Sequence, residues 1–154
     1  MKRARTILLV LTALVVLTMT APAKEKTEAV KPVVAGQVVK MKVTAYCPCE
    51  KCCGKWALRQ AQGKRTTATG DDAYVCDGVA ADFELLPKRT LLEIPGAGVK
   101  EVDDTGGAMR KAARQNPPVY HIDLRFPTHK EALKWGVKWL EVRVLPKTER
   151  RSVR

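Results

Sequence analysis

The stretch HIDLRFPTHKEALKWGVKWLEVRVL, residues 121–145, decides the fold because it predicts a strand, a helix and a second strand in immediate succession. Apolar residues recur at every second position in its first and last parts, the period of half-buried strands, which we place at 120–126 and 137–145. Between them, Thr128 with a glutamate three residues later has the spacing of a helix capping box, and Gly136 is a typical stop signal. The domain is therefore expected to end in strand–helix–strand.

Further short strands are expected upstream of this segment. Apolar residues alternate with polar ones over 39–46, and the short apolar runs 78–81, 90–94 and 98–102 are bounded by glycine, proline or polar residues. Short strands punctuated in this way are typical of a small barrel. We therefore expect one mainly β domain over residues 39–146, with one or two short helices.

The N-terminal segment has the pattern of an export signal. Three basic residues precede the uncharged stretch 6–23, which ends in a small-x-small pattern. Residues 1–23 are predicted to be a secretory signal peptide, with an uncleaved N-terminal anchor as the alternative, because the stretch is at the lower limit of what spans a bilayer. We interpret residues 24–38 as a linker and residues 147–154 as a basic tail.

Composition and charge narrow the functional classes. The chain has 154 residues, 45% hydrophobic and 29% charged, which favours a single globular domain over a multidomain enzyme. Its formal net charge of +12 should attract polyanions. An exported protein, in the periplasm or cell envelope, meets anionic wall polymers rather than nucleic acid, and the sequence has no basic helical stripe or aromatic platform for nucleic acid. We expect a monomer, associated with the membrane only through its N-terminal segment.

Five cysteines require an explanation in an exported chain. They are Cys47, Cys49, Cys52, Cys53 and Cys76. Disulfides are usual in an oxidising compartment, but five cysteines cannot all pair. A thiolate metal site, formed by three of the first four with Cys76, and free thiols are the alternatives. In the first two cases the cysteines would have a structural role, fastening the loop 47–53 to the barrel.

Three aspartates stand apart from the acids scattered among lysines and arginines. Asp82 follows an apolar strand, Asp104 precedes a Thr-Gly-Gly turn, and Asp123 lies between two apolar strand residues. Burial at such positions raises a carboxyl pKa toward values suited to proton donation, so these are candidate catalytic acids. The alternatives are a turn-forming Asp104 and an Asp123 that points to solvent. We expect His121 and His129 at the surface or the barrel edge.

Five segments occur in a fixed order along the domain. They are VTAYCPCEKCCG (43–54), TTATG (66–70), GVAADFELLPKRTLLEIPGAG (78–98), VDDTGG (102–107) and HIDLRFPTHKEALKWGVKWLEV (121–142). Together they resemble the three-aspartate (3D) domain family of bacterial cell-wall proteins over residues 40–145. The resemblance implies a six-stranded double-psi β-barrel and maps the three namesake aspartates onto Asp82, Asp104 and Asp123. The connection from Asp104 to Asp123 is longer than in the family and is expected to reshape or cover the cleft.

The same resemblance implies that the protein cleaves peptidoglycan glycan strands as a lytic transglycosylase, between N-acetylmuramic acid and N-acetylglucosamine. Asp123 would act as general acid and then as base, while Asp104 and Asp82 tune its pKa and stabilise developing positive charge. The residues expected to shape the sugar subsite are Thr105, Gly106, Gly107, Thr67, Thr69 and Gly70. No cofactor or metal is assigned to this site. The alternatives are a peptidoglycan-binding barrel without catalysis and an exported metal-binding protein organised by its cysteines.

Overall fold

The computed structural model describes residues 32–57, 60–61, 64–75 and 78–146. Several expectations fall on segments that lie outside the described residues: the signal or anchor 1–23, the linker up to residue 31, Cys76 and the tail 147–154. Within the described part of the chain, no helix is long and apolar enough to cross a membrane.

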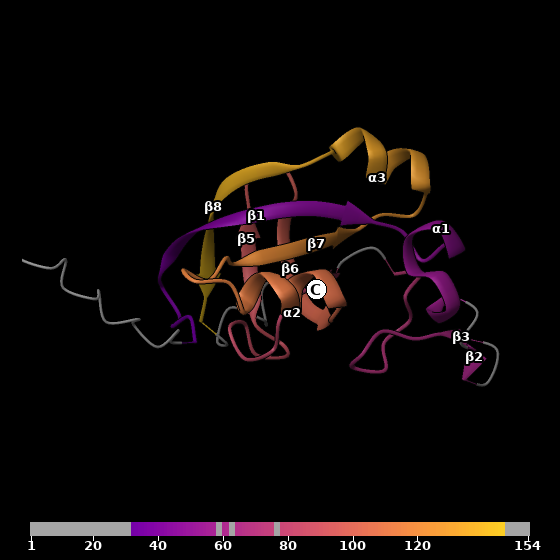
Figure 1. Cartoon of the computed structure of the whole chain (residues 1–154), viewed down its shortest axis with the longest axis horizontal. Helices are drawn as coiled ribbons and strands as arrows, with labels where there is room; N and C mark the ends of the chain where they lie inside the picture. Colours follow the sequence, from indigo (N-terminus) through magenta and orange to yellow (C-terminus); the bar gives the residue numbers. More distant parts are fainter. Residues whose placement is uncertain (1–31, 58–59, 62–63, 76–77, 147–154) are drawn as a thin grey trace, which may run out of the picture.

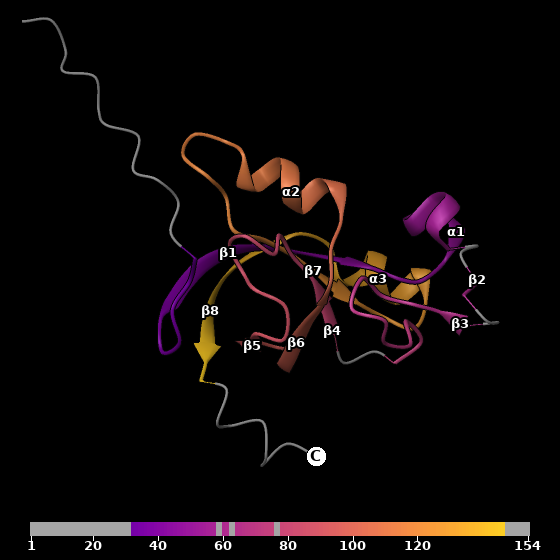
Figure 2. The same ribbon diagram turned by 90° about the horizontal axis from the view of Figure 1, so that it is seen from below.

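Six strands close into a barrel in the order β1-β7-β4-β6-β5-β8 (Figures 1 and 2). They are β1 (Val38–Tyr46), β4 (Gly78–Ala80), β5 (Leu91–Ile94), β6 (Gly98–Asp104), β7 (His121–Arg125) and β8 (Lys138–Leu145). The pairs β1–β7 and β4–β6 are parallel and the other pairs are antiparallel. This closed mixed barrel confirms the mainly β, six-stranded fold expected from the sequence, and its two parallel pairs agree with a double-psi arrangement. Short strands β2 (Gln60–Ala61) and β3 (Lys64–Arg65) form a separate hairpin.

The barrel interior is filled by the apolar residues of the alternating patterns. The fully buried core side chains include Met41, Val43, Val79, Leu92, Val102, Ile122 and Val142. In β8, Val142 is 0% exposed whereas Trp139 is 54% exposed, as the alternation predicts. Burial of apolar side chains from all six strands is the main stabilising contribution to this fold.

In the described part of the chain, three α-helices and one 3₁₀ turn accompany the barrel strands. The sequence predicted one or two helices, so the structure has at least one more than expected. They are α1 (Glu50–Cys53), η1 (Gly54–Trp56), α2 (Gly107–Ala113) and α3 (His129–Trp135). The capping box predicted at Thr128 is present at α3. The N-cap of α2 is Gly106, which has no side chain to cap the helix, so the usual sequence signal is missing. This helix occupies the long connection before β7, packs against that strand and buries Met109 and Ala112.

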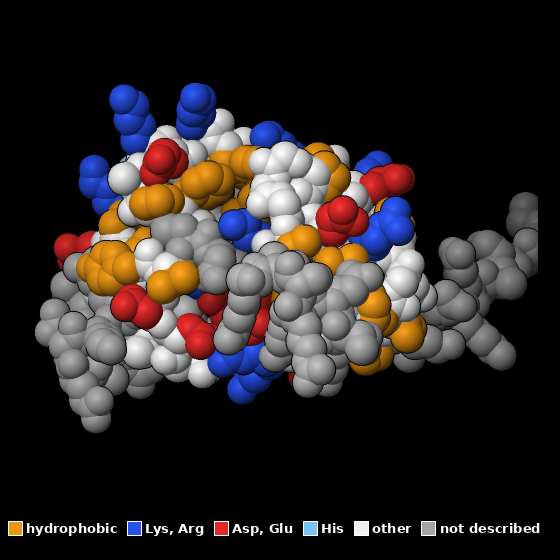
Figure 3. All heavy atoms as spheres, turned by 180° about the vertical axis from the view of Figure 1, so that it is seen from behind, with side chains coloured by type: hydrophobic (Ala, Val, Ile, Leu, Met, Phe, Trp, Pro, Cys, Tyr) orange, Lys and Arg blue, Asp and Glu red, His pale blue; other side chains and the backbone are white. Residues whose placement is uncertain are grey.

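The face opposite to that of Figure 1 carries a mixture of charges. Figure 3 shows Lys and Arg side chains projecting from the edge where α3 lies, and acidic and basic side chains next to one another lower on this face. On this face, positive charge is distributed rather than gathered into one patch.

Candidate functional site

Two carboxylates lie on the outer face of the barrel in a row that crosses four strands. Ala80 in β4 is the in-register partner of both Asp104 in β6 and Asp123 in β7. Thr44 in β1 continues the row as the partner of Asp123. Because neighbouring strands lie about 4.8 Å apart, the Cα atoms of the two aspartates are on the order of 10 Å apart, with only an alanine between them. We call these four residues the carboxylate row.

The surroundings of Asp123 favour its protonated form. Burial is the largest cause that raises the pKa of this carboxyl, and the negative charge of Asp104 raises it further. The hydrogen bond from Thr44 Oγ1, at 2.7 Å, and the charge of Lys42 act against the rise. A carboxyl whose pKa is raised keeps its proton closer to neutral pH than a solvated one does. Asp123 is therefore the member of the row with the properties of a proton donor.

His121 belongs to the same network, so the expectation that it lies at the surface or edge is wrong. Its side chain is buried, and its Nε2 lies 2.9 Å from Thr44 Oγ1. Burial lowers the pKa of the imidazole, and the charge of Lys42 lowers it further. The histidine is buried because α2 covers the outer face of β7, and the backbone of Ala108 in that helix contacts the ring through a hydrogen bond.

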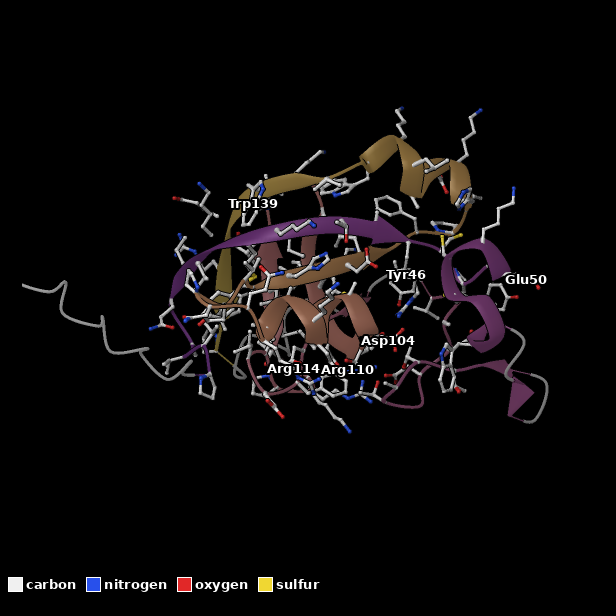
Figure 4. All side chains as sticks on the ribbon, in the orientation of Figure 1. Tyr46, Glu50, Asp104, Arg110, Arg114 and Trp139 are labelled. Carbon is white, nitrogen blue, oxygen red and sulfur yellow. The ribbon has the colours of Figure 1, made fainter. Side chains whose placement is uncertain are left out.

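Asp104 is held by three hydrogen-bond donors. The Tyr46 hydroxyl donates to Oδ2 at 2.7 Å, and the amides of Ala68 and Thr105 donate to Oδ1 at 3.0 and 2.8 Å. Figure 4 shows Tyr46 and Asp104 close together beside α2. Burial raises the pKa of Tyr46 far above its usual value, and the Asp104 carboxylate raises it further, so the phenol stays protonated and keeps its donor role.

A buried ion pair lies next to this tyrosine. Arg125 in β7 donates to both carboxylate oxygens of Asp103 and to the Tyr46 hydroxyl. The side chains of Arg125 and Asp103 are 0% and 6% exposed. Burial acts to lower the pKa of Arg125, but the contacts with Asp103 and Tyr46 together raise that pKa above its usual value. Burial also raises the pKa of Asp103, and Arg125 acts against that rise. The guanidinium donates to both carboxylate oxygens, which is the geometry of a charged pair, and each partner depends on the other.

Asp103 reaches Arg125 through a β-bulge. The pairing of β4 with β6 shifts in register and skips Asp103, which re-aims its side chain. Gly78 leaves the required space, because a Cβ at that position would overlap the Asp103 carboxylate. Sequence reasoning missed this pair. The one signal available was the position of Arg125 two residues after Asp123, which places both on the same face of a strand.

The third expected aspartate has a different local role. The Asp82 Oδ1 accepts hydrogen bonds from the amides of Glu84 and Leu85 at 2.9 and 3.3 Å. These are the bonds of a turn-forming aspartate at the end of β4. Among the described residues, it is Asp104 rather than Asp82 that raises the pKa of Asp123. The structure thus brings together two of the three candidate acids, and Asp82 supports the backbone beside them.

The residues expected to shape a sugar subsite lie on two segments that flank Asp104. Segment 67–70 turns against the end of β6, where the amide and the hydroxyl of Thr69 both contact the Asp103 carbonyl, at 3.1 and 2.7 Å. Segment 105–107 follows Asp104 directly and leads into α2. Both segments are therefore close enough to border a ligand that contacts Asp104.

A second group of reactive side chains gathers where β1 ends. Its members, which we call the thiol–imidazole cluster, are Cys47, Cys49, Cys52 and His129, and their ligand atoms all lie within 4.8 Å of one another. Figure 4 shows sulfur atoms between α1 and the beginning of α3. The described cysteines are free thiols. His129 is half-buried, and its contact with the cysteines was not predicted from the sequence.

Cys53 faces away from this cluster and toward the carboxylate row. Its Sγ contacts the Cys47 carbonyl at 3.3 Å, and its side chain packs against Tyr46 and Met109. Burial raises the pKa of its thiol to about 11, with smaller contributions that include Asp104. Helix α1 therefore carries one residue of the thiol–imidazole cluster, Cys52, and one residue, Cys53, that packs beside the partner of Asp104.

A separate hollow of about 290 Å³ lies on another part of the surface. It is lined by residues that include Ala97, Lys100, Phe126 and Trp135, and by no member of the carboxylate row. Most of these residues belong to the barrel end near α3. The hollow reaches the buried ion pair through Arg125, but neither Asp104 nor Asp123 lines it.

Together, the fold and the site define a small mixed β-barrel that carries two carboxylates, from two strands, on the same face of its sheet. No protein-family model matches the chain, and a search of the curated proteins finds no match.

Proposed function

We propose that the protein cleaves peptidoglycan glycan strands as a lytic transglycosylase, with Asp123 as its general acid and base. The observation that carries the proposal is the carboxylate row, in which burial and a neighbouring carboxylate raise the pKa of Asp123. The ordered motif resemblance to three-aspartate domains supports the same function. The proposal includes export through residues 1–23, which lie outside the described part of the chain.

The reaction needs one group that gives a proton and takes it back. Protonated Asp123 would donate to the glycosidic oxygen as the bond to the anomeric carbon of N-acetylmuramic acid breaks. The resulting carboxylate would remove the proton of the C6 hydroxyl as that oxygen attacks the same carbon. This forms a 1,6-anhydro sugar, returns the proton to Asp123 and consumes no water.

Asp104 has the surroundings of a stabilising group rather than a proton donor. Three donors converge on its carboxylate, so its negative charge is matched by hydrogen bonds. A fixed negative charge on this face would stabilise positive charge that develops on the sugar ring in the transition state. The two carboxylates thus have different environments, which is the arrangement that separates an acid from a stabiliser.

A binding module without cleavage is the second candidate. The observation that favours it is the position of α2, which packs on β7 beside Asp123 and narrows access to that carboxyl. The same helix exposes Arg110, Lys111 and Arg114, of which Arg110 and Arg114 are labelled in Figure 4. These cations would attract acidic stem peptides of the wall.

Digestion of purified sacculi, followed by mass spectrometry of the products, tests the two candidates. Cleavage releases 1,6-anhydro muropeptides, whereas binding alone gives co-sedimentation without products. Asp123→Asn should lower the rate by about 10²- to 10⁴-fold, the usual contribution of general acid–base catalysis. The matched control is Glu141→Gln, which removes a negative charge from an exposed position in β8 and should leave the rate unchanged.

The stability of Asp123→Asn should depend on pH in a way that shows whether this variant folds. Because the pKa of Asp123 is raised in the folded state, the wild-type fold loses stability as pH rises through the interval between the unfolded value of 3.8 and the raised value. Asparagine does not ionise, so Asp123→Asn should become more stable relative to wild type as pH increases across that interval. Urea unfolding at several pH values measures this. Anhydro products at the wild-type rate from a folded variant would remove the assignment of Asp123.

A further inference from the structure

The thiol–imidazole cluster is assembled from two distant parts of the chain. Cys47, Cys49 and Cys52 follow β1 and enter α1, whereas His129 is the first residue of α3. The imidazole Nδ1 lies 3.2 Å from Cys52 Sγ, and 3.9 and 4.0 Å from the other two sulfurs. The Cys47 sulfur lies 2.9 Å from that of Cys49 and 3.6 Å from that of Cys52. Each donor atom therefore faces the same small space.

These distances are close to the edges of a zinc-centred tetrahedron. With Zn–S bonds of about 2.3 Å and a Zn–N bond of about 2.0–2.1 Å, two sulfurs are about 3.8 Å apart and a sulfur and a nitrogen about 3.6 Å apart. The five separations given above, 2.9 to 4.0 Å, scatter around these values. The one between Cys47 and Cys49 departs most, by about 0.9 Å, which is small enough for side-chain rotation to correct. Three thiols and one imidazole are also a donor set that selects zinc.

Both halves of the cluster are held by local structure that forms independently. The amides of Cys52 and Cys53 donate to the Cys49 carbonyl at 3.1 and 2.8 Å, which fixes the turn that carries the thiols. On the other side, the capping box of Thr128 fixes the first turn of α3 and so the position of His129. A site whose donors are positioned by the backbone before binding needs little reorganisation to accept an ion.

We propose that the thiol–imidazole cluster binds one zinc ion as a closed structural site. All four tetrahedral positions are filled by protein donors, so no position remains for a catalytic water. The ion fastens α1 to the start of α3. Because Cys53 in α1 packs against Tyr46, which donates to Asp104, the bound zinc also fixes one wall of the carboxylate row.

A disulfide fits the same geometry less completely. Cys47 contacts both Cys49 and Cys52 but can bond to only one of them, which leaves the remaining thiol and His129 without a role. The shorter of the two sulfur separations, 2.9 Å, is also well beyond the roughly 2.05 Å of a disulfide bond. Zinc coordination accounts for all four side chains together.

Elemental analysis of the full chain, purified under reducing conditions with no added chelator, tests the proposal. About one zinc per chain is expected, and zinc-free protein should take up added Zn²⁺ or Co²⁺, the latter with the absorption bands of a tetrahedral thiolate site. His129→Ala should weaken zinc binding by more than the roughly 10- to 100-fold that loss of an outer partner costs. Circular dichroism shows whether that variant retains the fold.

Two cysteine variants provide matched controls. Cys53→Ser changes a residue that is next to a ligand but whose side chain faces away from the cluster. Cys76→Ser changes the cysteine that lies outside the described residues. Both variants should retain zinc. Loss of zinc in Cys76→Ser would overturn this donor set. So would reduced wild-type protein that takes up no metal, or a cluster disulfide that persists in zinc-loaded protein. These measurements do not involve glycan cleavage, so they stand or fall separately from the proposed function.

Discussion

The carboxylate row and the thiol–imidazole cluster both begin at β1, yet they are held together in different ways. The row uses residues that are neighbours by strand pairing, with Thr44 beside Asp123 and Ala80 between the two aspartates. Barrel hydrogen bonds therefore place these groups whether or not a ligand is present. The cluster lies instead between a helix of four residues and the first turn of α3.

The two regions also differ in what satisfies their polar side chains. In the row, protein donors already satisfy the polar groups: Tyr46 donates to Asp104, and Thr44 donates to Asp123. In the cluster, three thiols and one imidazole present their sulfur and nitrogen atoms to the same small space. The polar groups of the row are therefore satisfied within the fold, whereas the four donor atoms of the cluster acquire a common partner only when an ion binds. The comparison makes predictions that differ for the two regions.

Loss of the buried ion pair should have the largest effect, and that effect should be a loss of barrel stability. Arg125→Met leaves the Asp103 carboxylate buried without a partner, so we expect unfolding to become easier by about 3–5 kcal/mol. Urea denaturation measures the change. Because the barrel strands hold the carboxylate row in place, a destabilised barrel should also disorder the row. Glycan cleavage should then fall in parallel.

The exposed ion pair of the same barrel is the control for this variant. Arg143 contacts Glu93 at 3.3 Å, with the two side chains 59% and 56% exposed. Arg143→Met should therefore change stability by less than about 1 kcal/mol. Equal losses from Arg125→Met and Arg143→Met would mean that the buried pair does not support the barrel as the comparison requires. Asp103→Asn added to Arg125→Met should recover part of the loss, because it removes the stranded charge.

Removal of one hydroxyl should have an intermediate effect on the row. Tyr46→Phe deletes the donor to Asp104 and the acceptor for Arg125, which lie 2.7 and 3.1 Å from the Tyr46 oxygen. We expect a loss of about 1–3 kcal/mol, since both partners are charged groups that are left with one hydrogen bond fewer. Zinc content should not change, because the phenyl ring still packs against Cys53.

Urea unfolding and metal analysis of the same preparation measure these two effects together. Trp139→Phe, which shortens an exposed aromatic side chain in β8, is the control and should leave both quantities near wild type. A large fall in zinc content for Tyr46→Phe would show that the row and the cluster are not independent at this tyrosine. The row and the cluster would then share structural support through Tyr46.

Sequence patterns predicted those parts of the molecule that depend on local signals. The alternation in β1 and β8 and the capping box at Thr128 each act within a few residues, and all three are present in the structure. The same short-range patterns predicted a small barrel of short strands, and the resemblance to three-aspartate domains implied its six-stranded form. For this reason the fold could be predicted more completely than either group of side chains.

The missing parts depend on contacts between distant segments. His129 meets cysteines that are 77 to 82 positions away, and no local pattern records that approach. The contact between Asp103 and Arg125 requires both the strand order β7-β4-β6 and a bulge in β6. Helix α2 was missed because its N-cap is a glycine, and with it the burial of His121. Each omission has the same physical origin, namely a tertiary arrangement without a sequence period.

The smallest effect is expected from the capping residue that precedes the cluster histidine. Thr128→Ala removes the two hydrogen bonds of the Thr128 hydroxyl, which accepts from the Glu131 amide and donates to the Glu131 carboxylate, so stability should fall by about 1 kcal/mol. The more informative consequence concerns His129, whose backbone is then less firmly held. We expect zinc affinity to fall by about 10-fold, similar to the loss of an outer partner of a metal ligand, while glycan cleavage continues.

Thr90→Ala is the control, because the Thr90 hydroxyl also makes a local hydrogen bond, donated to the Pro87 carbonyl at 2.6 Å, but lies far from the cluster in the sequence. It should cost a similar amount of stability and leave zinc affinity unchanged. Competition with a chelator of known affinity measures both variants. If Thr128→Ala and Thr90→Ala bind zinc equally well, the position of His129 is fixed by the ion and not by the cap. The cluster would then depend on its ligand even more than the comparison with the carboxylate row implies.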